Sequence, residues 1–191
     1  MPQATGFVVA GGLSRRMGRD KALLPWEGGT LLDHAIARLR QVTDDVRILC
    51  GPEPRYADRG LPLVTDGDGG PAALAGLLAG LLALERPLGL FLAVDLPHAS
   101  VPLLRHLLAL ADGWDAVVPV SAGGPEPLCA VYAGSCLAAV RAAVARGDLK
   151  MTGFWNEVRV RQPGAAELRD FGDARQFLNL NAPSDYERAR G

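Results

Sequence analysis

The chain has 191 residues, of which 49% are hydrophobic and 21% charged, so it is long and apolar enough to bury a core of ordinary size. The formal net charge of −1 excludes a generally basic nucleic-acid-binding protein, and any positive patch must be local. The three cysteines lack metal-ligand spacing, which excludes a typical zinc site; we predict reduced thiols, two of them buried, in a cytoplasmic protein.

Along the first two thirds of the chain, short apolar runs alternate with longer helical patterns. These patterns predict strands at 6–10, 45–50, 61–64, 88–94 and 115–120, and helices at 30–41, 72–84 and 101–111. Thr30 and Ser100 stand where they can cap the first and third helices. The runs 6–10 and 88–94 are apolar on both faces, which is typical of a parallel sheet covered by helices. The uncharged run 71–84 falls short of the ~20 residues that span a bilayer, so we interpret it as a core helix and expect no membrane partner.

After residue 120 the rhythm of the sequence changes. We predict a strand at 126–132, a helix at 134–146, a strand at 158–162 and a closing helix from Pro183, with a mobile loop at 121–125. Neither an internal repeat nor a long linker divides the chain, so we predict one domain over residues 1–191. The fold class is α/β: a three-layer α/β/α arrangement around a mostly parallel sheet, with an antiparallel strand in its C-terminal part.

The loop after the first strand, GGLSRRMGRDKALL (11–24), combines glycines with four basic side chains. Glycines let backbone N–H groups approach an anion, and the basic residues Arg15, Arg16, Arg19 and Lys21 can pair with phosphates. The spacing matches neither the Walker A motif nor the G-x-G-x-x-G dinucleotide motif. Two interpretations stay open: a phosphate-binding loop, or a basic surface turn in which glycine serves tight geometry.

Asp95 stands at the end of the apolar run 88–94 and precedes Leu-Pro. Ligands of open α/β sheets bind beyond the carboxyl ends of the strands, and a carboxylate there suits Mg²⁺, which shares oxygen ligands with phosphates. The alternative is an aspartate that starts the turn before Ser100. A phosphate-type loop on a neighbouring strand favours the metal site.

The segment VVAGGLSRRMGRDKALLPWEG resembles the motif A-[GA]-G-x-S-x-R-M-G-x-[DP]-K of nucleotidyltransferases, and its Asp-Lys ending with a double glycine most resembles the molybdenum cofactor guanylyltransferases. Further segments agree in order along the chain: Asp66 before a glycine-rich turn, ALAGL (73–77), AVDLP (93–97), EPLCAVY (126–132) and FLNLNAPSD (177–185). The resemblance implies a Rossmann-like nucleotidyltransferase fold. It also implies transfer of GMP from GTP to the phosphate of molybdopterin, with release of pyrophosphate.

The resemblance further implies a role for individual residues. Lys21 and Arg16 would serve the triphosphate, and Asp95 would hold Mg²⁺ and complete the catalytic set. Asp66 would accept hydrogen bonds from guanine or ribose, although a turn aspartate is the alternative. The backbone that would face the base belongs to Val9, Ala10, Gly11 and Gly12. The candidate acceptor residues are Asn179 and Asn181, the latter equally a helix cap before Pro183.

The sequence leaves open both the nucleotide base and the class of activity. Gly11 favours GTP over CTP, because cytosine-using relatives more often carry alanine there. A departure from some relatives is Cys50-Gly51, which stands where a polar residue is often found. The alternatives are a cytidylyltransferase acting on the same pterin, a sugar-phosphate nucleotidylyltransferase, or an inactive nucleotide-binding module. The resemblance implies transient partner proteins that hand over the cofactor, and no nucleic-acid partner.

Overall fold

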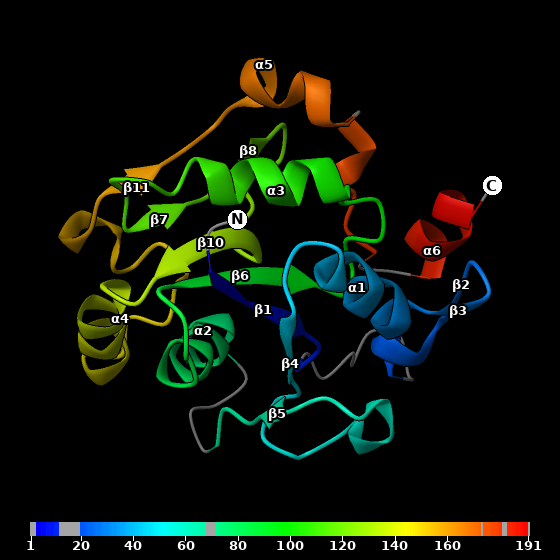
Figure 1. Ribbon diagram of the computed structural model, residues 1–191, viewed down its shortest axis with the longest axis horizontal. Helices are drawn as coiled ribbons and strands as arrows, with labels where there is room; N and C mark the ends of the chain where they lie inside the picture. Colours follow the sequence, from blue (N-terminus) through cyan, green and yellow to red (C-terminus); the bar gives the residue numbers. More distant parts are fainter. Residues whose placement is uncertain (1–2, 12–19, 68–71, 173, 181–182, 191) are drawn as a thin grey trace.

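The structure is a computed structural model that describes residues 3–11, 20–67, 72–172, 174–180 and 183–190 (Figure 1). Within these residues one sheet contains the strands β1 (Ala4–Val9), β4 (Asp45–Leu49), β5 (Leu63–Val64), β6 (Leu88–Ala93), β7 (Ala116–Val117), β10 (Cys129–Ala133) and β11 (Val160–Arg161). Their order is β11-β7-β10-β6-β1-β4-β5. All neighbours pair in parallel except β10, which is antiparallel to both β6 and β7. The predicted mostly parallel sheet with an antiparallel C-terminal strand is confirmed.

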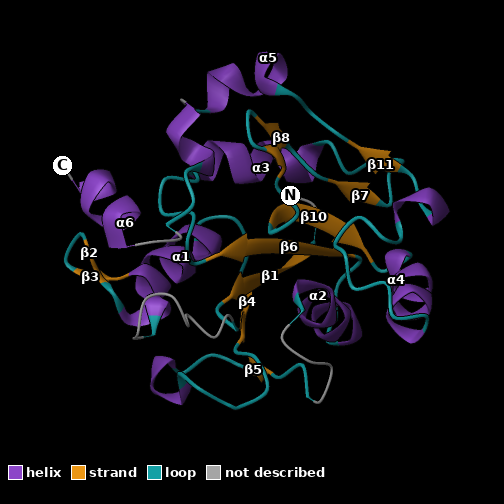
Figure 2. Cartoon of the chain, turned by 180° about the vertical axis from the view of Figure 1, so that it is seen from behind, coloured by secondary structure: helices purple, strands orange, loops and turns teal. Residues whose placement is uncertain are grey.

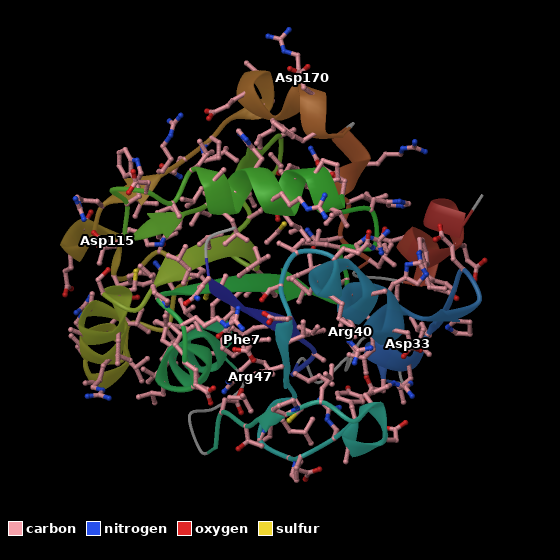
Figure 3. The ribbon with its side chains drawn as sticks, viewed as in Figure 1. Phe7, Asp33, Arg40, Arg47, Asp115 and Asp170 are labelled. Atoms are coloured by element: carbon pink, nitrogen blue, oxygen red, sulfur yellow. The ribbon has the colours of Figure 1, made fainter. Side chains whose placement is uncertain are left out.

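Helices cover both faces of the sheet (Figure 1). One face carries α1 (Leu31–Arg40) and α3 (Val101–Ala109), and the other carries α2 (Ala73–Leu82) and α4 (Cys136–Ala145). Phe7 of β1 and Phe91 of β6 stack at a centroid distance of 4.8 Å beneath the second pair of helices. Phe7 lies in the middle of the sheet, opposite Arg47 of β4 (Figure 3). Because each face has its own apolar cluster, the central strands are buried on both sides, as their sequence predicts.

The predicted helix starts are confirmed in detail. Thr30 and Asp33 form a reciprocal capping box, in which the Asp33 N–H donates to the Thr30 hydroxyl and the Thr30 N–H donates to the Asp33 carboxylate. At α3 the Leu103 N–H donates to the Ser100 hydroxyl over 3.1 Å, with proline in the first turn. These local signals work because each cap satisfies backbone donors that the first helical turn leaves without a partner.

Two hairpins replace what the sequence presents as loops. The segment 121–125 is not an open loop, because β8 (Val120–Ser121) pairs with β9 (Gly124–Pro125). The sequence pattern likewise does not predict the pairing of β2 (Pro25–Trp26) with β3 (Gly29–Thr30). The turn between β2 and β3 places Glu27 at φ 41° and Gly28 at φ 84°. Strands of two residues carry no periodic pattern, so neither hairpin is visible in hydrophobic spacing.

The C-terminal part returns toward the first helix. Helix α6 (Pro183–Arg190) lies beside the β2–β3 hairpin (Figure 2), where the Tyr186 hydroxyl donates to the Pro25 carbonyl. The remaining short elements are η1 (Lys21–Leu23), η2 (Ala57–Arg59), η3 (Trp155–Glu157), α5 (Ala165–Leu168), η4 (Arg169–Phe171) and η5 (Ala174–Phe177). All three cysteines are free and buried, one more than expected. In the part of the chain that is described, no helix combines the length and the apolar character needed to cross a membrane.

Candidate active site

The carboxyl ends of four adjacent parallel strands form one edge of the sheet. In spatial order β6, β1, β4 and β5, these strands are followed by Asp95, Gly11, Gly51 and Asp66. Three inter-strand spacings of about 4.8 Å place the outer two of these positions roughly 14 Å apart. Residues that are far apart in the sequence thus line one edge, where α/β sheets bind their ligands.

Lys21 and Asp95, the two predicted catalytic residues that the structure describes, lie together at this edge. The Lys21 Nζ is 3.1 Å from the Asp95 Oδ2, with 15% and 21% of the two side chains exposed. Lys21 opens η1 and Asp95 follows β6, so the ion pair joins the loop after β1 to the neighbouring strand. A half-buried cation and carboxylate side by side suit a ligand that carries both phosphate and metal.

Gly11 and Gly51 pack backbone against backbone at the ends of β1 and β4. A Cβ on Gly11 would lie 2.8 Å from the Gly51 nitrogen and 3.0 Å from its Cα. Gly51 itself has φ 81°, a conformation that favours glycine. The structure therefore gives Gly11 a packing role beside Gly51, and its part in the choice of GTP over CTP stays a prediction. Of its predicted neighbours, Ala10 is buried and Val9 is half-buried.

Asp66 marks the far end of the edge. Its N–H donates to the Gly51 carbonyl over 3.1 Å, which ties the segment after β5 to the segment after β4. Its Oδ1 is buried and accepts no hydrogen bond from the described residues. Burial raises the pKa of this carboxyl above its usual value. A ligand that donates a hydrogen bond would satisfy the buried oxygen.

The predicted acceptor residue Asn179 lies next to Asp95. The Leu180 N–H donates to the Asp95 carbonyl over 3.0 Å, so the C-terminal segment passes directly beside the end of β6. A cavity of about 800 Å³ adjoins this contact, between the β8–β9 hairpin and the residues 165–179. Its polar lining includes Ser121, Glu126, Arg169, Arg175, Gln176 and Asn179.

Glu126 is a candidate that the sequence did not single out. Burial and the negative charge of Asp95 raise the pKa of its carboxyl, while hydrogen bonds from Ser121 and Asn179 act in the opposite direction. The Ser121 hydroxyl donates to the Glu126 Oε1 over 2.7 Å. The sequence signal that could have indicated Glu126 is its place before Pro127 in EPLCAVY. Its proximity to Asp95, however, depends on the antiparallel pairing of β10 with β6.

Asp20, Arg55 and Tyr56 were also missed as site residues. The Asp20 carboxylate caps η1 by accepting the Ala22 N–H over 3.0 Å, directly before Lys21. Arg55 and Tyr56 both donate to the other oxygen of this carboxylate. Arg55 and Tyr56 lie 35 and 36 residues after Asp20 in the sequence, so no local pattern links them. The contacts are visible only in the folded chain.

Other predicted residues lie elsewhere or cannot be placed. Gly12, Arg15, Arg16, Arg19 and Asn181 are outside the described residues. The histidines make structural contacts: His34 hydrogen-bonds to Arg38, His98 lies edge-on to Trp26 and His106 stacks on Phe171.

The described residues offer a metal a small donor set. No group of three or more histidine, cysteine, aspartate or glutamate side chains in the described ranges could hold an ion by itself. Asp95 offers one carboxylate, already beside a cation, at the edge where a phosphate ligand would lie. This set fits Mg²⁺, which binds to one or two carboxylates and takes its other ligands from water and substrate phosphates.

Comparison with known proteins identifies the family. Residues 6–160 match the model of the MobA-like NTP transferase domain. A probable molybdenum cofactor guanylyltransferase from Pelotomaculum thermopropionicum is 34% identical over 191 residues, which cover 100% of this chain and 93% of that protein. The chain belongs to the molybdenum cofactor guanylyltransferase family. A second probable family member, from Chloroflexus aggregans, is 35% identical over 95% of this chain and 90% of its own length.

A solved structure extends the likeness to three dimensions. The molybdopterin-guanine dinucleotide biosynthesis protein A from Archaeoglobus fulgidus superposes with a TM-score of 0.83 at 25% identity, covering 97% of this chain and 96% of that one. The predicted family, fold class and enzyme class, a nucleotidyltransferase, are thereby confirmed. The chain belongs to the nucleotidyltransferases, a class of enzymes that require a divalent metal in general.

Proposed function

We propose that this chain transfers GMP from GTP to the phosphate of molybdopterin and releases pyrophosphate. The observation that carries the proposal is the pair of Lys21 and Asp95, 3.1 Å apart between the loop after β1 and the end of β6. In the reaction an acceptor phosphate oxygen forms a bond to the α-phosphorus, and the bond from that phosphorus to the bridging oxygen of pyrophosphate breaks. The protein has to position two phosphates and offset their charge.

The nucleotide half of the site runs along the edge from Asp95 to Asp66. We assign the triphosphate to Lys21 and Arg16, and the base to the backbone of residues 9–12, Val9 to Gly12. The unsatisfied Oδ1 of Asp66 is the acceptor for an N–H of guanine or a ribose hydroxyl. The ends of β6 and β5, which precede Asp95 and Asp66, lie roughly 14 Å apart by strand spacing, a span that one extended nucleotide can cover.

Asp95 is the residue that would hold Mg²⁺. When bound, the ion would neutralise phosphate charge that the protein alone offsets only in part. With the Asp95 carboxylate engaged by the ion, Lys21 would be released to contact the phosphates directly. One cation then replaces another at Asp95, so no uncompensated charge is left half-buried.

The acceptor half occupies the cavity of about 800 Å³ beside Asn179. We assign acceptor binding to Asn179 and Asn181, with Glu126 at the same wall. The cavity lies beyond β6 on the β10 side, whereas Lys21 reaches Asp95 from η1, which follows β1. The acceptor phosphate therefore approaches from one side of Asp95 and pyrophosphate leaves on the other, as in-line displacement requires. We further propose that residues 1–191 act as one domain in the cytoplasm and exchange the cofactor with transient partner proteins.

Calorimetric titration of Mg²⁺ and GTP tests the nucleotide site. Lys21→Ala and Asp95→Asn should each weaken binding of the Mg²⁺–GTP complex by about tenfold or more, because one well-placed charge in such a site is worth several kcal/mol. Lys150→Ala is the matched control, since Lys150 is the other lysine of the sequence and is exposed. Equal affinities in all four proteins would reject the assignment of Lys21 and Asp95.

A further inference from the structure

One guanidinium holds both ends of the loop between β1 and η1. The Arg55 Nη2 donates to the Ala10 carbonyl over 3.2 Å, at the end of β1, and to the Cys50 carbonyl over 3.1 Å, at the end of β4. The Arg55 Nη1 donates to the Asp20 Oδ2 over 3.2 Å, at the start of η1. The planar fork of arginine can serve three acceptors at once, which a lysine ammonium on a flexible stem does with poorer geometry.

Tyr56 adds a second attachment at Asp20. Its hydroxyl donates to the Asp20 Oδ2 over 2.7 Å, and its side chain is buried. Burial and the neighbouring Asp20 raise the pKa of this phenol, so the hydroxyl stays protonated and remains a donor. Tyr56 has φ 71°, a conformation that costs a non-glycine residue energy and persists only where the surroundings impose it.

These contacts converge on the residue before Lys21. The Asp20 carboxylate accepts from Arg55, Tyr56 and the Ala22 N–H, so the direction of η1 is fixed at its first turn. Lys21 begins η1 and reaches Asp95 from there. The positive charge of Arg55 also offsets the negative charge of Asp20, which would otherwise oppose a triphosphate bound beside it.

We propose that Arg55 and Tyr56 are positioning residues for nucleotidyl transfer, which set the place of Lys21 by holding Asp20 against the ends of β1 and β4. The inference rests on the proposed function, because it assigns Lys21 to the triphosphate. Neither side chain has to touch the substrate, and both act through Asp20 and Lys21.

A thermodynamic cycle separates positioning from a merely structural role. Tyr56→Phe keeps the ring and removes one hydroxyl, so the fold is retained even if Arg55→Gln proves unstable. Tyr56→Phe and Arg55→Gln should each lower kcat with GTP by about ten- to a hundredfold, since small misplacements of a catalytic charge cost that much. In a Lys21→Ala background the same changes should cause little further loss of kcat, because their effect passes through Lys21.

Arg59→Gln is the matched control for Arg55→Gln. Arg59 has a similar exposed fraction, 25% against 30%, and pairs with Asp33 and Asp58 rather than with Asp20. It should keep the wild-type kcat. The inference is overturned if Tyr56→Phe lowers only the melting temperature. It is also overturned if the losses of kcat in Tyr56→Phe and Arg55→Gln add fully to the loss in Lys21→Ala. A wild-type protein that neither binds nor uses GTP would instead reject the proposed function itself.

Discussion

At the residue scale, the contact between Gly11 and Gly51 restricts position 11, the start of the loop 11–24, to a residue without a side chain. The atoms nearest a Cβ on Gly11 are backbone atoms of Gly51, which cannot rotate away as a side chain would. The loop after β1 therefore depends on the shape of the turn after β4. This dependence couples two positions that lie 40 residues apart in the sequence, a coupling that no local pattern reveals.

Gly11→Ala should destabilise the protein by about 1–3 kcal/mol, because the added carbon forces two backbones apart. It should also weaken GTP binding, since the loop then starts from a displaced position. Gly76→Ala is the control: nothing lies within 4 Å of its Cβ, and in the interior of α2 alanine should add up to about 1 kcal/mol. Urea denaturation of both variants measures the two free energies of unfolding. A Gly11→Ala protein as stable as the wild type would refute the packing argument.

Some site residues could be predicted from the sequence because their neighbours in the chain indicate their chemical role. Lys21 stands in a motif with glycines and arginines, and Asp95 ends an apolar strand. Arg55 could not be predicted, because its acceptors Ala10 and Asp20 are 45 and 35 residues away. Glu126 was missed for the same reason: its neighbours Asp95 and Asn179 meet it only across the folded sheet.

At the scale of elements, Asp115 joins β7, β11 and α4 at the sheet margin. The Ser135 hydroxyl, just before α4, donates to its Oδ1 over 2.7 Å, and the Arg159 N–H donates to its Oδ2 over 2.9 Å. With the Arg159 guanidinium also bonded, these donors hold the pKa of the Asp115 carboxyl well below its usual range. Figure 3 labels Asp115 on the side of the molecule where α4 lies, and Asp170 at the top, beside α5.

Asp115→Asn should lower the free energy of unfolding near pH 7 by about 1 kcal/mol, a value reduced by solvent screening. A carboxyl whose pKa is lowered by folding stabilises above its unfolded pKa of about 3.9, and this contribution is lost as the pH falls below that value. The difference in melting temperature between variant and wild type should therefore narrow below about pH 4.

Asp170→Asn serves as the control, because Asp170 is an exposed aspartate on η4. Its melting temperature should follow that of the wild type at every pH. A difference for Asp115→Asn that stays constant from pH 7 to pH 3 would show that the charge of Asp115 does not contribute.

Elements longer than about eight residues were predicted well, because their periodicity and caps act within one segment. Helices α1 and α3 begin where Thr30 and Ser100 predict. The hairpins β2–β3 and β8–β9 were not predicted, because each consists of two-residue strands held by their turns. The expected strand 115–120 is divided, since only Ala116–Val117 joins the main sheet and Val120 belongs to a hairpin.

At the scale of the whole molecule, the proposed function places both halves of the reaction at one edge of the sheet. In this proposal the first half of the chain would supply the nucleotide side, through the ends of β1, β4 and β5. The second half would supply the acceptor side, through the cavity between the β8–β9 hairpin and described residues of the segment from Ala165 to Asn179. Strand β6 separates them and carries Asp95 at its end. The alternation of strands and helices predicted this architecture, including the antiparallel C-terminal strand, whereas the cavity is lined by the β8–β9 hairpin and irregular C-terminal segments that carry no periodic pattern.

Pyrophosphate release decides whether the chain is a guanylyltransferase: it is measured with and without molybdopterin and with and without Mg²⁺, separately for GTP, CTP, ATP and UTP. We expect release with GTP that depends on both the acceptor and the metal and is strongly reduced in Lys21→Ala. Release with CTP instead of GTP, or no release with any nucleotide while the acceptor is present, would contradict this expectation.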